Sequence, residues 1–216
     1  MAGKLAGMLT FTAETHEYRY AGVVIPSVTQ ILGQAGMVEI PHFRDGRVER
    51  KRLIGTAVHR ACEFLNQGDL DWSTVDPDVE PYARAYDEFL RRSEFGPVLT
   101  EHRFSTIIDG LSYAGTLDIA GDMGGVPFLI DIKTPLATQP HWAIQTAGYE
   151  LGIKPPAVRP WKWQRAALKL RPDGEHRLVR FDDPSDRDVF RAALRDRNHP
   201  AVLRWKANHS IGIEEE

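Results

Sequence analysis

Two hydrophobic periods follow one another along the chain. From about residue 47 to residue 94, apolar side chains recur every three or four positions, as they do on one face of a helix. Between residues 98 and 133 the apolar residues instead form strand-like runs separated by turn signals. The chain therefore predicts two helices followed by a group of strands.

The two predicted helices span residues 47–66 and 78–94. The first has a stripe of apolar residues at every fourth position, which we expect to face a core: Leu53, Ala57, Ala61 and Leu65. The apolar face of the second consists of Val79, Tyr82, Tyr86, Phe89 and Leu90. Shorter elements precede them: residues 16–25 predict a strand pair, and Ser27 and Gln30 have capping-box spacing at the start of a helix.

The C-terminal part predicts one more strand pair and one helix. The strands cover residues 165–170 and 176–181 and extend the sheet. The helix covers residues 185–198, and we expect Ser185 to cap it and Pro200 to end it. The acidic tail "GIEEE" at residues 212–216 is expected to fray. Neither segment offers obvious chemistry.

Turn signals set the register of the predicted strands. Asp109-Gly110 is a strong two-residue hairpin signal, and a turn at these residues places Glu101 directly across from Asp118. Both side chains then point to the same face of the sheet. The register thus predicts a carboxylate pair on neighbouring strands.

A second hairpin extends this pair to a row of three acids. A turn at Gly124-Gly125 places Asp118 across from Asp131 as well. Cβ atoms of directly opposed residues lie about 4.5 to 5.5 Å apart, so three carboxylates in a row repel one another unless a cation lies between them. Lys133 points to the same face as Asp131. We expect the acids to bind a divalent cation, with Lys133 beside the reacting group; the alternative is an exposed face with a surface Asp-Lys pair.

The first helix supplies a candidate nitrogen ligand. In the segment "GTAVHRACEF", Gly55 and Thr56 would allow close backbone approach, and His59 and Glu63 lie one turn apart on one face. Glu63 would orient His59 or approach the metal. The alternative is an ordinary histidine and a solvated glutamate.

A further candidate surface lies in the segment "HWAIQTAGYE". Gln145 and Tyr149 are four residues apart on one helical face together with Trp142. Amide and hydroxyl groups donate to phosphate oxygens, and an aromatic ring stacks on an unpaired base, so this face would contact nucleic acid. Core packing of both aromatic residues is the alternative.

Composition narrows the class of protein. The 216 residues, 42% of them hydrophobic, suit one domain over residues 1–216, with the motif-bearing core at about 47–182. No apolar run approaches membrane-spanning length and no convincing secretory signal is present, so we expect a cytoplasmic protein without membrane contact. The formal net charge of -3 argues against a strongly basic protein that coats nucleic acid, although basic runs at 43–52 and 159–171 would suit DNA contacts or solvated faces.

The candidate residues in this order resemble the PD-(D/E)xK nuclease superfamily, specifically its RecB-type exonuclease branch. The match covers about residues 55–149 and has the marks of that branch: "GTAVH", the glutamate of "TEHRF", "GTLD", "DIK" and "QTAGY". Leu117-Asp118 replaces the literal Pro-Asp, which leaves the aspartate in place. Relatives that carry an iron–sulfur cluster have four cysteines, and Cys62 is the only cysteine here, so no cluster is expected.

This resemblance implies a restriction-endonuclease-like α/β core with a mixed central sheet flanked by helices. It also implies metal-dependent hydrolysis of DNA. Asp118, Asp131 and the carbonyl of Ile132 offer the oxygen ligands that Mg²⁺ prefers, and the imidazole of His59 makes Mn²⁺ equally suitable.

The remaining residues of the resemblance would act beside that metal. Lys133 would orient the attacking water or stabilise charge in the transition state, together with the catalytic carboxylates Asp131 and Asp118. Glu101 would hold a second ion or a metal-bound water. Gln145 and Tyr149 would bind the substrate.

We therefore expect an exonuclease of DNA recombination, repair or phage replication. Its substrate would be single- or double-stranded DNA ends, and its partners a recombinase, helicase or single-strand-binding protein. Two alternatives remain open: a catalytically inactive DNA-binding or scaffold subunit with the nuclease fold, and a phosphohydrolase of small phosphate esters.

Overall fold

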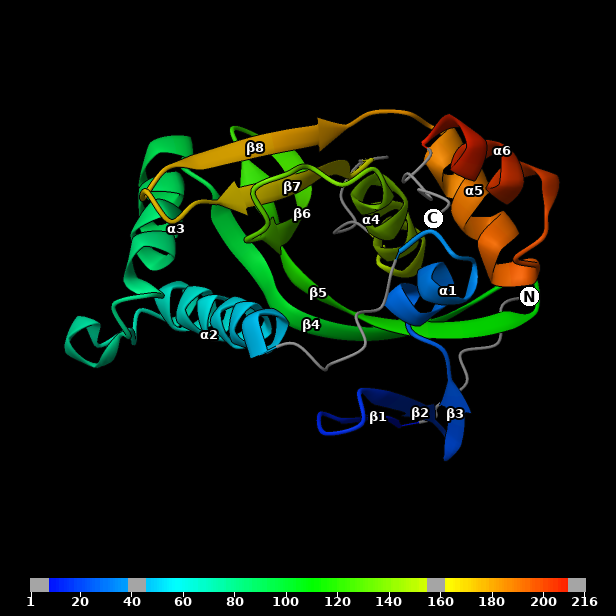
Figure 1. Cartoon of the computed structure of the whole chain (residues 1–216), viewed down its shortest axis with the longest axis horizontal. Coiled ribbons are helices and arrows are strands. Elements are labelled where there is room, and N and C mark those ends of the chain that lie inside the picture. Colours follow the sequence, from blue (N-terminus) through cyan, green and yellow to red (C-terminus); the bar gives the residue numbers. More distant parts are fainter. Residues whose placement is uncertain (1–7, 39–45, 155–161, 210–216) are drawn as a thin grey trace.

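A five-stranded mixed sheet forms the centre of the protein (Figure 1). The computed structural model describes residues 8–38, 46–154 and 162–209. The strands follow one another in the sheet in chain order: β4 (Gly96–Ile108), β5 (Leu111–Met123), β6 (Val126–Lys133), β7 (Gln164–Leu170) and β8 (His176–Phe181). β6 and β7 are parallel, and the other neighbours are antiparallel. Helix α4 (His141–Gly152) provides the crossover between the parallel pair, as parallel pairing requires.

Helices cover both faces of this sheet. α2 (Gly46–Gln67) and α3 (Glu80–Ser93) pack on one face, with the 3₁₀ turn Trp72–Thr74 between them. The other face is covered by α1 (Val28–Gln34), α4, α5 (Ser185–Arg195) and α6 (Pro200–Asn208). The predicted fold class, an α/β protein with a mixed central sheet flanked by helices, is confirmed.

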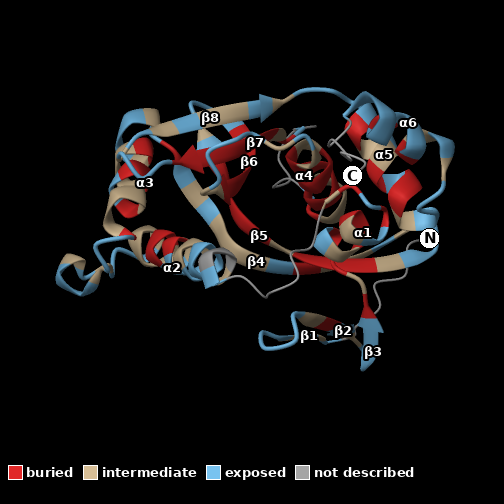
Figure 2. Cartoon of the chain, in the orientation of Figure 1, coloured by how far each residue is buried: buried red, intermediate tan, exposed pale blue. Residues whose placement is uncertain are grey.

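Alternation along β6 divides its side chains between the two cores. Leu129 packs with the α4 side, whereas Ile130 and Ile132 pack with the α2 side. Asp131 therefore points to the α4 side, as Leu129 does. Because both faces are covered, β6 and β7 are buried along almost their whole length (Figure 2). Among the described residues, no helix is long and apolar enough to span a membrane.

The strand register agrees with the turns predicted from the sequence. The pair Ile108 and Leu111 closes the turn at Asp109–Gly110, and the pairs on either side of Glu101 keep one register, which would oppose Glu101 to Asp118 if it continued through that residue. In the next hairpin, the turn at Gly124–Gly125 starts a register that runs to the pair Ile119 and Ile130, the last pair before Asp118 and Asp131. Both predicted turns are confirmed, and direct pairing of the three acids stays a prediction.

A second, three-stranded sheet lies against the outer side of the long β4–β5 hairpin (Figure 1). It consists of β1 (Leu9–Thr12), β2 (Glu17–Tyr20) and β3 (Val23–Ile25). The sequence predicted only two of these strands, because β1 is short and only its own alternation marks it. The capping box of Ser27 and Gln30 at the start of α1 is confirmed.

The predicted apolar stripe of the first helix is wrong in its first half. Leu53 is 53% exposed and Ala57 is also exposed, whereas Ala61 is buried. Residues four apart drift by about 40° per step around a helix of 3.6 residues per turn, so a strict four-residue stripe leaves the core. The side chains that α2 packs against the sheet are Ile54, Val58, Ala61, Cys62 and Leu65. For the second helix, the predicted face is confirmed.

The predicted helix over residues 185–198 is α5, which ends at Arg195, and a further helix that the sequence did not predict, α6, follows it. Ser185 does not cap α5; its backbone N–H donates instead to Oδ1 of Asp183 at 2.8 Å. Pro200 begins α6 rather than only ending a helix, and His199 caps it. Proline suits a first helical turn because the N–H it lacks has no intrahelical partner there.

Replacing either of two helical glycines by alanine should change stability in opposite directions. A Cβ on Gly148 would lie 2.6 Å from the buried ring of Phe190, so Gly148→Ala should lower the free energy of unfolding by about 1–3 kcal/mol through overpacking. A Cβ on Gly55 would meet only Thr134 Oγ1 at 3.7 Å, an ordinary contact. Gly55→Ala should therefore raise stability by about 0.5–1 kcal/mol. Urea unfolding of both variants measures this, and equal stability of Gly148→Ala and the wild type would contradict it.

Candidate active site

Three candidate ligands from three elements meet in one pocket. His59 of α2 lies with its Nδ1 atom 3.7 Å from Oε1 of Glu101 on β4 and 3.5 Å from Oδ1 of Asp118 on β5. One ligand atom from each residue lies within 4.8 Å of the others. Two carboxylates and an imidazole are donors that Mn²⁺ accepts, and the carboxylates suit Mg²⁺. The residues present therefore fit a divalent cation.

Asp131 and Lys133 of β6 complete the charged group. Oδ2 of Asp131 lies 2.5 Å from Nζ of Lys133, and both residues line the same cavity of about 270 Å³ as the other three. Asp131 is 2% exposed. All three predicted acids thus face one cavity.

The backbone of β6 holds Asp118 in place. Oδ2 of Asp118 accepts a hydrogen bond of 2.6 Å from the N–H of Ile132. This side-chain contact follows the last ladder pair between β5 and β6. It fixes the carboxylate against the strand that carries Asp131. The predicted role of the Ile132 carbonyl as a metal ligand stays a prediction.

Glu101 has an unusual backbone for a residue inside a strand. Its φ is +47°, although the ladder keeps one register on both sides of it. A non-glycine residue in this left-handed region costs on the order of 1–3 kcal/mol, and such strain concentrates at functional sites. The strained residue, Glu101, is also the one whose carboxylate lies near His59, so the backbone strain falls on a residue of the candidate site.

The ionisable side chains in the pocket shift one another's pKa values. Burial lowers the pKa of His59, but Asp118 and Glu101 outweigh burial and raise it to about 10. Burial raises the pKa of Asp131; Lys133 opposes this and Asp118 adds to it, so the pKa reaches about 6. For Asp118, burial also acts to raise the pKa, but the positive charges of His59 and Lys133 leave it below its ordinary value. The acids thus already attract positive charge.

Gln145 of α4 contacts Lys133, and Tyr149 of the same helix contacts Gln145. Nζ of Lys133 donates to Oε1 of Gln145 at 3.0 Å, and Nε2 of Gln145 donates to the hydroxyl of Tyr149 at 2.8 Å. Both residues are buried yet line the cavity. Their predicted substrate contact stays a prediction, and the geometry adds a second task, which is to orient the lysine.

Two residues of the sequence interpretation do not belong to the site. Trp142 is 2% exposed, so it is packed in the core and does not offer a stacking face to a base; its ring lies 5.8 Å from Nζ of Lys133. Glu63 pairs with exposed Arg60 at 2.6 Å, as the solvated alternative has it. The spacing of residues on α2 and α4 gave no signal that could separate these outcomes, because both depend on distant packing.

Several described arginines of the two basic runs pair with acids of the protein itself. In the second run, Arg165 is buried and pairs with Asp186 at 2.8 Å and with Glu150 at 3.2 Å. Lys169 donates to the carbonyl of Leu136. In the first run, Arg50 and Arg52 form exposed ion pairs with Asp78 and Glu49. Residues 43–45 and 159–161 of these runs lie outside the described residues.

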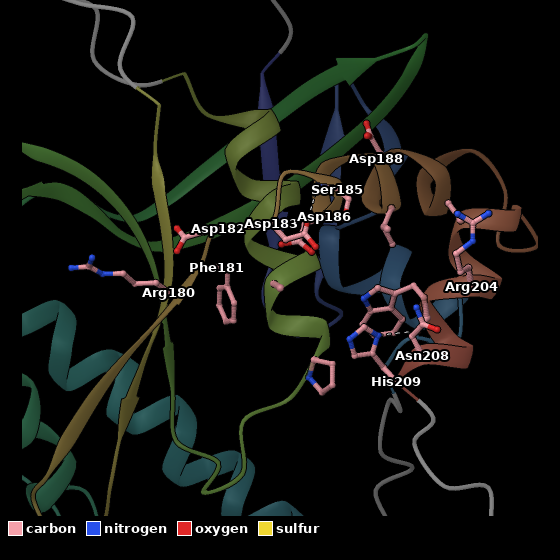
Figure 3. Close-up of a pocket in the computed structure, with 15 residues that line it drawn as sticks. Arg180, Phe181, Asp182, Asp183, Ser185, Asp186, Asp188, Arg204, Asn208 and His209 are labelled. Carbon is pink, nitrogen blue, oxygen red and sulfur yellow. Dashed lines mark hydrogen bonds between the residues drawn. The ribbon is translucent and has the colours of Figure 1, made fainter.

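A larger cavity of about 580 Å³ lies away from this site, between the end of β8, the start of α5 and α6 (Figure 3). It shares no lining residue with the smaller one. Of its acids, Asp186 is held by Arg165 and Asp183 accepts from Ser185. The larger of the two cavities is therefore not the one that contains the candidate metal ligands.

Comparisons with known proteins leave the family of this chain open. No family model matches the sequence, and no curated protein does. Among solved structures, a provisionally assigned exonuclease from Eubacterium rectale has a TM-score of 0.45 at 12% identity, covering 83% of this chain and 74% of its own. The protein SSO0001 has a TM-score of 0.37 at 11% identity, covering 79% and 82%. Structural similarities this distant say nothing about the function of this chain, and the residues of the site are the stronger evidence.

The site predicts that a divalent cation stabilises the fold. Mn²⁺ should raise the melting temperature of the wild type, because a ligand bound only by the folded state adds about 2.7 kcal/mol at 100 times its Kd. Asp118→Asn should lose most of this shift. Glu63→Gln, on the same helix as His59 but paired with Arg60, should keep it. Differential scanning fluorimetry with and without Mn²⁺ checks this, and equal shifts in the wild type and Asp118→Asn would exclude the site.

Proposed function

We propose that this protein is a Mg²⁺- or Mn²⁺-dependent deoxyribonuclease of the PD-(D/E)xK type, acting as an exonuclease. One observation carries the proposal: His59, Glu101, Asp118 and the pair Asp131 and Lys133 converge on one cavity from four separate elements. A solvated surface pair would not bury Asp131. Three carboxylates that share only two positive partners, His59 and Lys133, are costly to gather in one cavity, and a bound cation would lower that cost.

The proposed chemistry assigns a distinct task to each group. When bound, a divalent cation lowers the pKa of water and offsets charge on the phosphate. His59, Glu101, Asp118 and Asp131 would hold that cation. In the proposed hydrolysis, water gives up a proton and its oxygen forms a new bond to phosphorus, while the bond from phosphorus to one sugar oxygen breaks and that oxygen takes up a proton.

Lys133 places its ammonium group beside this reaction. Its positive charge stabilises negative charge that develops on the phosphate oxygens, and a fixed charge in a water-poor site acts more strongly than one in bulk water. Gln145 accepts from Lys133 and so keeps the ammonium group from pairing with Asp131 alone. Tyr149 fixes Gln145 in turn.

The wider setting follows from the resemblance alone. DNA recombination, repair or phage replication, and a recombinase, helicase or single-strand-binding partner, stay predictions. The cytoplasmic location and the single domain over residues 1–216 do so as well.

Purified protein should degrade DNA with Mn²⁺ or Mg²⁺ and stop when EDTA removes the cation, because the proposed site depends on metal-activated water. Single- and double-stranded DNA, each labelled at either end, resolves the products on a gel. Release of mononucleotides or short fragments from an end supports an exonuclease. Undiminished cleavage in EDTA contradicts the metal site. DNA binding without cleavage favours the scaffold alternative, and hydrolysis of only a small phosphate ester favours the phosphohydrolase.

Asp131 and Lys133 should fail in different ways. Asp131→Ala removes a ligand, so Mn²⁺ affinity and turnover should fall together. Lys133→Ala removes a positive charge near the cation, so Mn²⁺ binding should survive or tighten while turnover falls by about 10²–10³. Lys154→Ala, at an exposed lysine, is the matched control for lost charge. Calorimetric titration paired with a nuclease assay measures both quantities. Wild-type turnover in Lys133→Ala, or wild-type Mn²⁺ affinity in Asp131→Ala, would refute this division of tasks.

A further inference from the structure

Three aromatic side chains of the small N-terminal sheet line the same cavity as the acids. Phe11 of β1, His16 of the connecting turn and Tyr18 of β2 are in mutual ring contact. Centroid distances are 5.2 Å for Phe11 and His16, 4.6 Å for Phe11 and Tyr18, and 5.8 Å for His16 and Tyr18. Tyr18 is buried, Phe11 is half-buried and His16 is exposed. An aromatic cluster thus lines the cavity, and His16 is its exposed member.

Hydrogen bonds fix this surface relative to the candidate active site. The hydroxyl of Tyr18 lies 2.6 Å from Oγ1 of Thr116, two residues before Asp118 on β5. The N–H of Ala114 on the same strand donates to the carbonyl of Pro26. The rings are therefore held by the strand that carries a site acid.

Arginine accompanies the rings. The guanidinium of Arg103 lies 4.9 Å from the ring centroid of Phe11 and also lines the cavity. Arg103 follows Glu101 by two residues on β4. Guanidinium groups bind phosphate through paired donors, and rings stack on bases, so ring and arginine together suit the two halves of a nucleotide.

Packing alone does not account for Phe11 and His16. The buried members of this small cluster are only Tyr18, Ile25 and Ala114, and Phe11 is packed against them from outside. His16 is exposed and has a φ of +51°, a conformation that non-glycine residues seldom adopt. An aromatic edge kept partly open beside acids is expected of a surface that receives a ligand.

We propose that Phe11 and His16 form a stacking platform for one unpaired nucleobase, with Arg103 binding the adjoining phosphate, so that the enzyme selects single-stranded DNA or unpaired ends. This inference rests on the proposed nuclease function. A cavity of about 270 Å³ is near the small end of ligand pockets, so a single nucleotide suits it better than a duplex. A paired base is already stacked on its neighbours and does not offer its face to a ring.

Kinetics with a missing base test the platform. Mn²⁺-dependent cleavage is measured on single-stranded oligonucleotides that are intact or carry an abasic nucleotide at the end, and on the matching blunt duplex. The wild type should prefer the intact single strand over the abasic one by about tenfold, within the range of base–aromatic stacking. The variant Phe11→Ala/His16→Ala should lose this preference, mainly through a higher KM for the intact strand.

Two controls separate stacking from packing. Phe11→Leu keeps apolar volume without a ring face, so it should fold normally and still lose the preference. Thr12→Ala, at an exposed position on the same hairpin, should behave as the wild type. An unchanged preference in Phe11→Leu and in the double variant, or a wild type that prefers the duplex, overturns the platform while the nuclease function stands. If the wild type cleaves no DNA with either metal, the nuclease function fails and the platform fails with it.

Discussion

Repulsion among Glu101, Asp118 and Asp131 is the constraint on which the rest of the site depends. These carboxylates line one cavity, where burial acts to raise the pKa of Asp118 and of Asp131. Two positively charged side chains offset this repulsion: His59 of α2 lies near Asp118, and Lys133 of β6 lies near Asp131. A cation that enters this site therefore meets acids whose charge is only partly balanced, which is how a cavity acquires affinity for a metal.

The layered fold explains why this balance takes several elements. Short hairpin turns place the acids on adjacent strands. The histidine and the glutamine of the site lie on helices, so the alternation of side chains along the strands does not place them. α2 supplies His59 and the crossover helix α4 supplies Gln145. The buried ion pairs of Arg165 with Glu150 and Asp186 tie α4 and α5 to β7, so basic residues that resembled a DNA surface help to hold the wall of the site.

Local chemistry made part of this fold predictable. Asp109–Gly110 and Gly124–Gly125 specify tight turns, a tight turn specifies register, and register alone brings Glu101, Asp118 and Asp131 together. What depends on distant packing was not predictable. Burial of Trp142 and exposure of Leu53 follow from how each helix is rotated against the sheet, and the spacing of apolar residues fixes that rotation only within tens of degrees. The aromatic cluster at Phe11 was missed because β1 is short and only its own alternation marks it.

Gln145 illustrates why residue type and spacing leave a role open. An amide at this position can donate to a phosphate or accept from a lysine, and the sequence contains no information on which partner lies closer. In the structure its oxygen faces Lys133 and its nitrogen faces Tyr149. Both polar ends are then engaged, so any contact with a phosphate must compete with these bonds. A lysine shared between a carboxylate and an amide has a defined direction, as the proposed stabilisation of a developing phosphate charge requires.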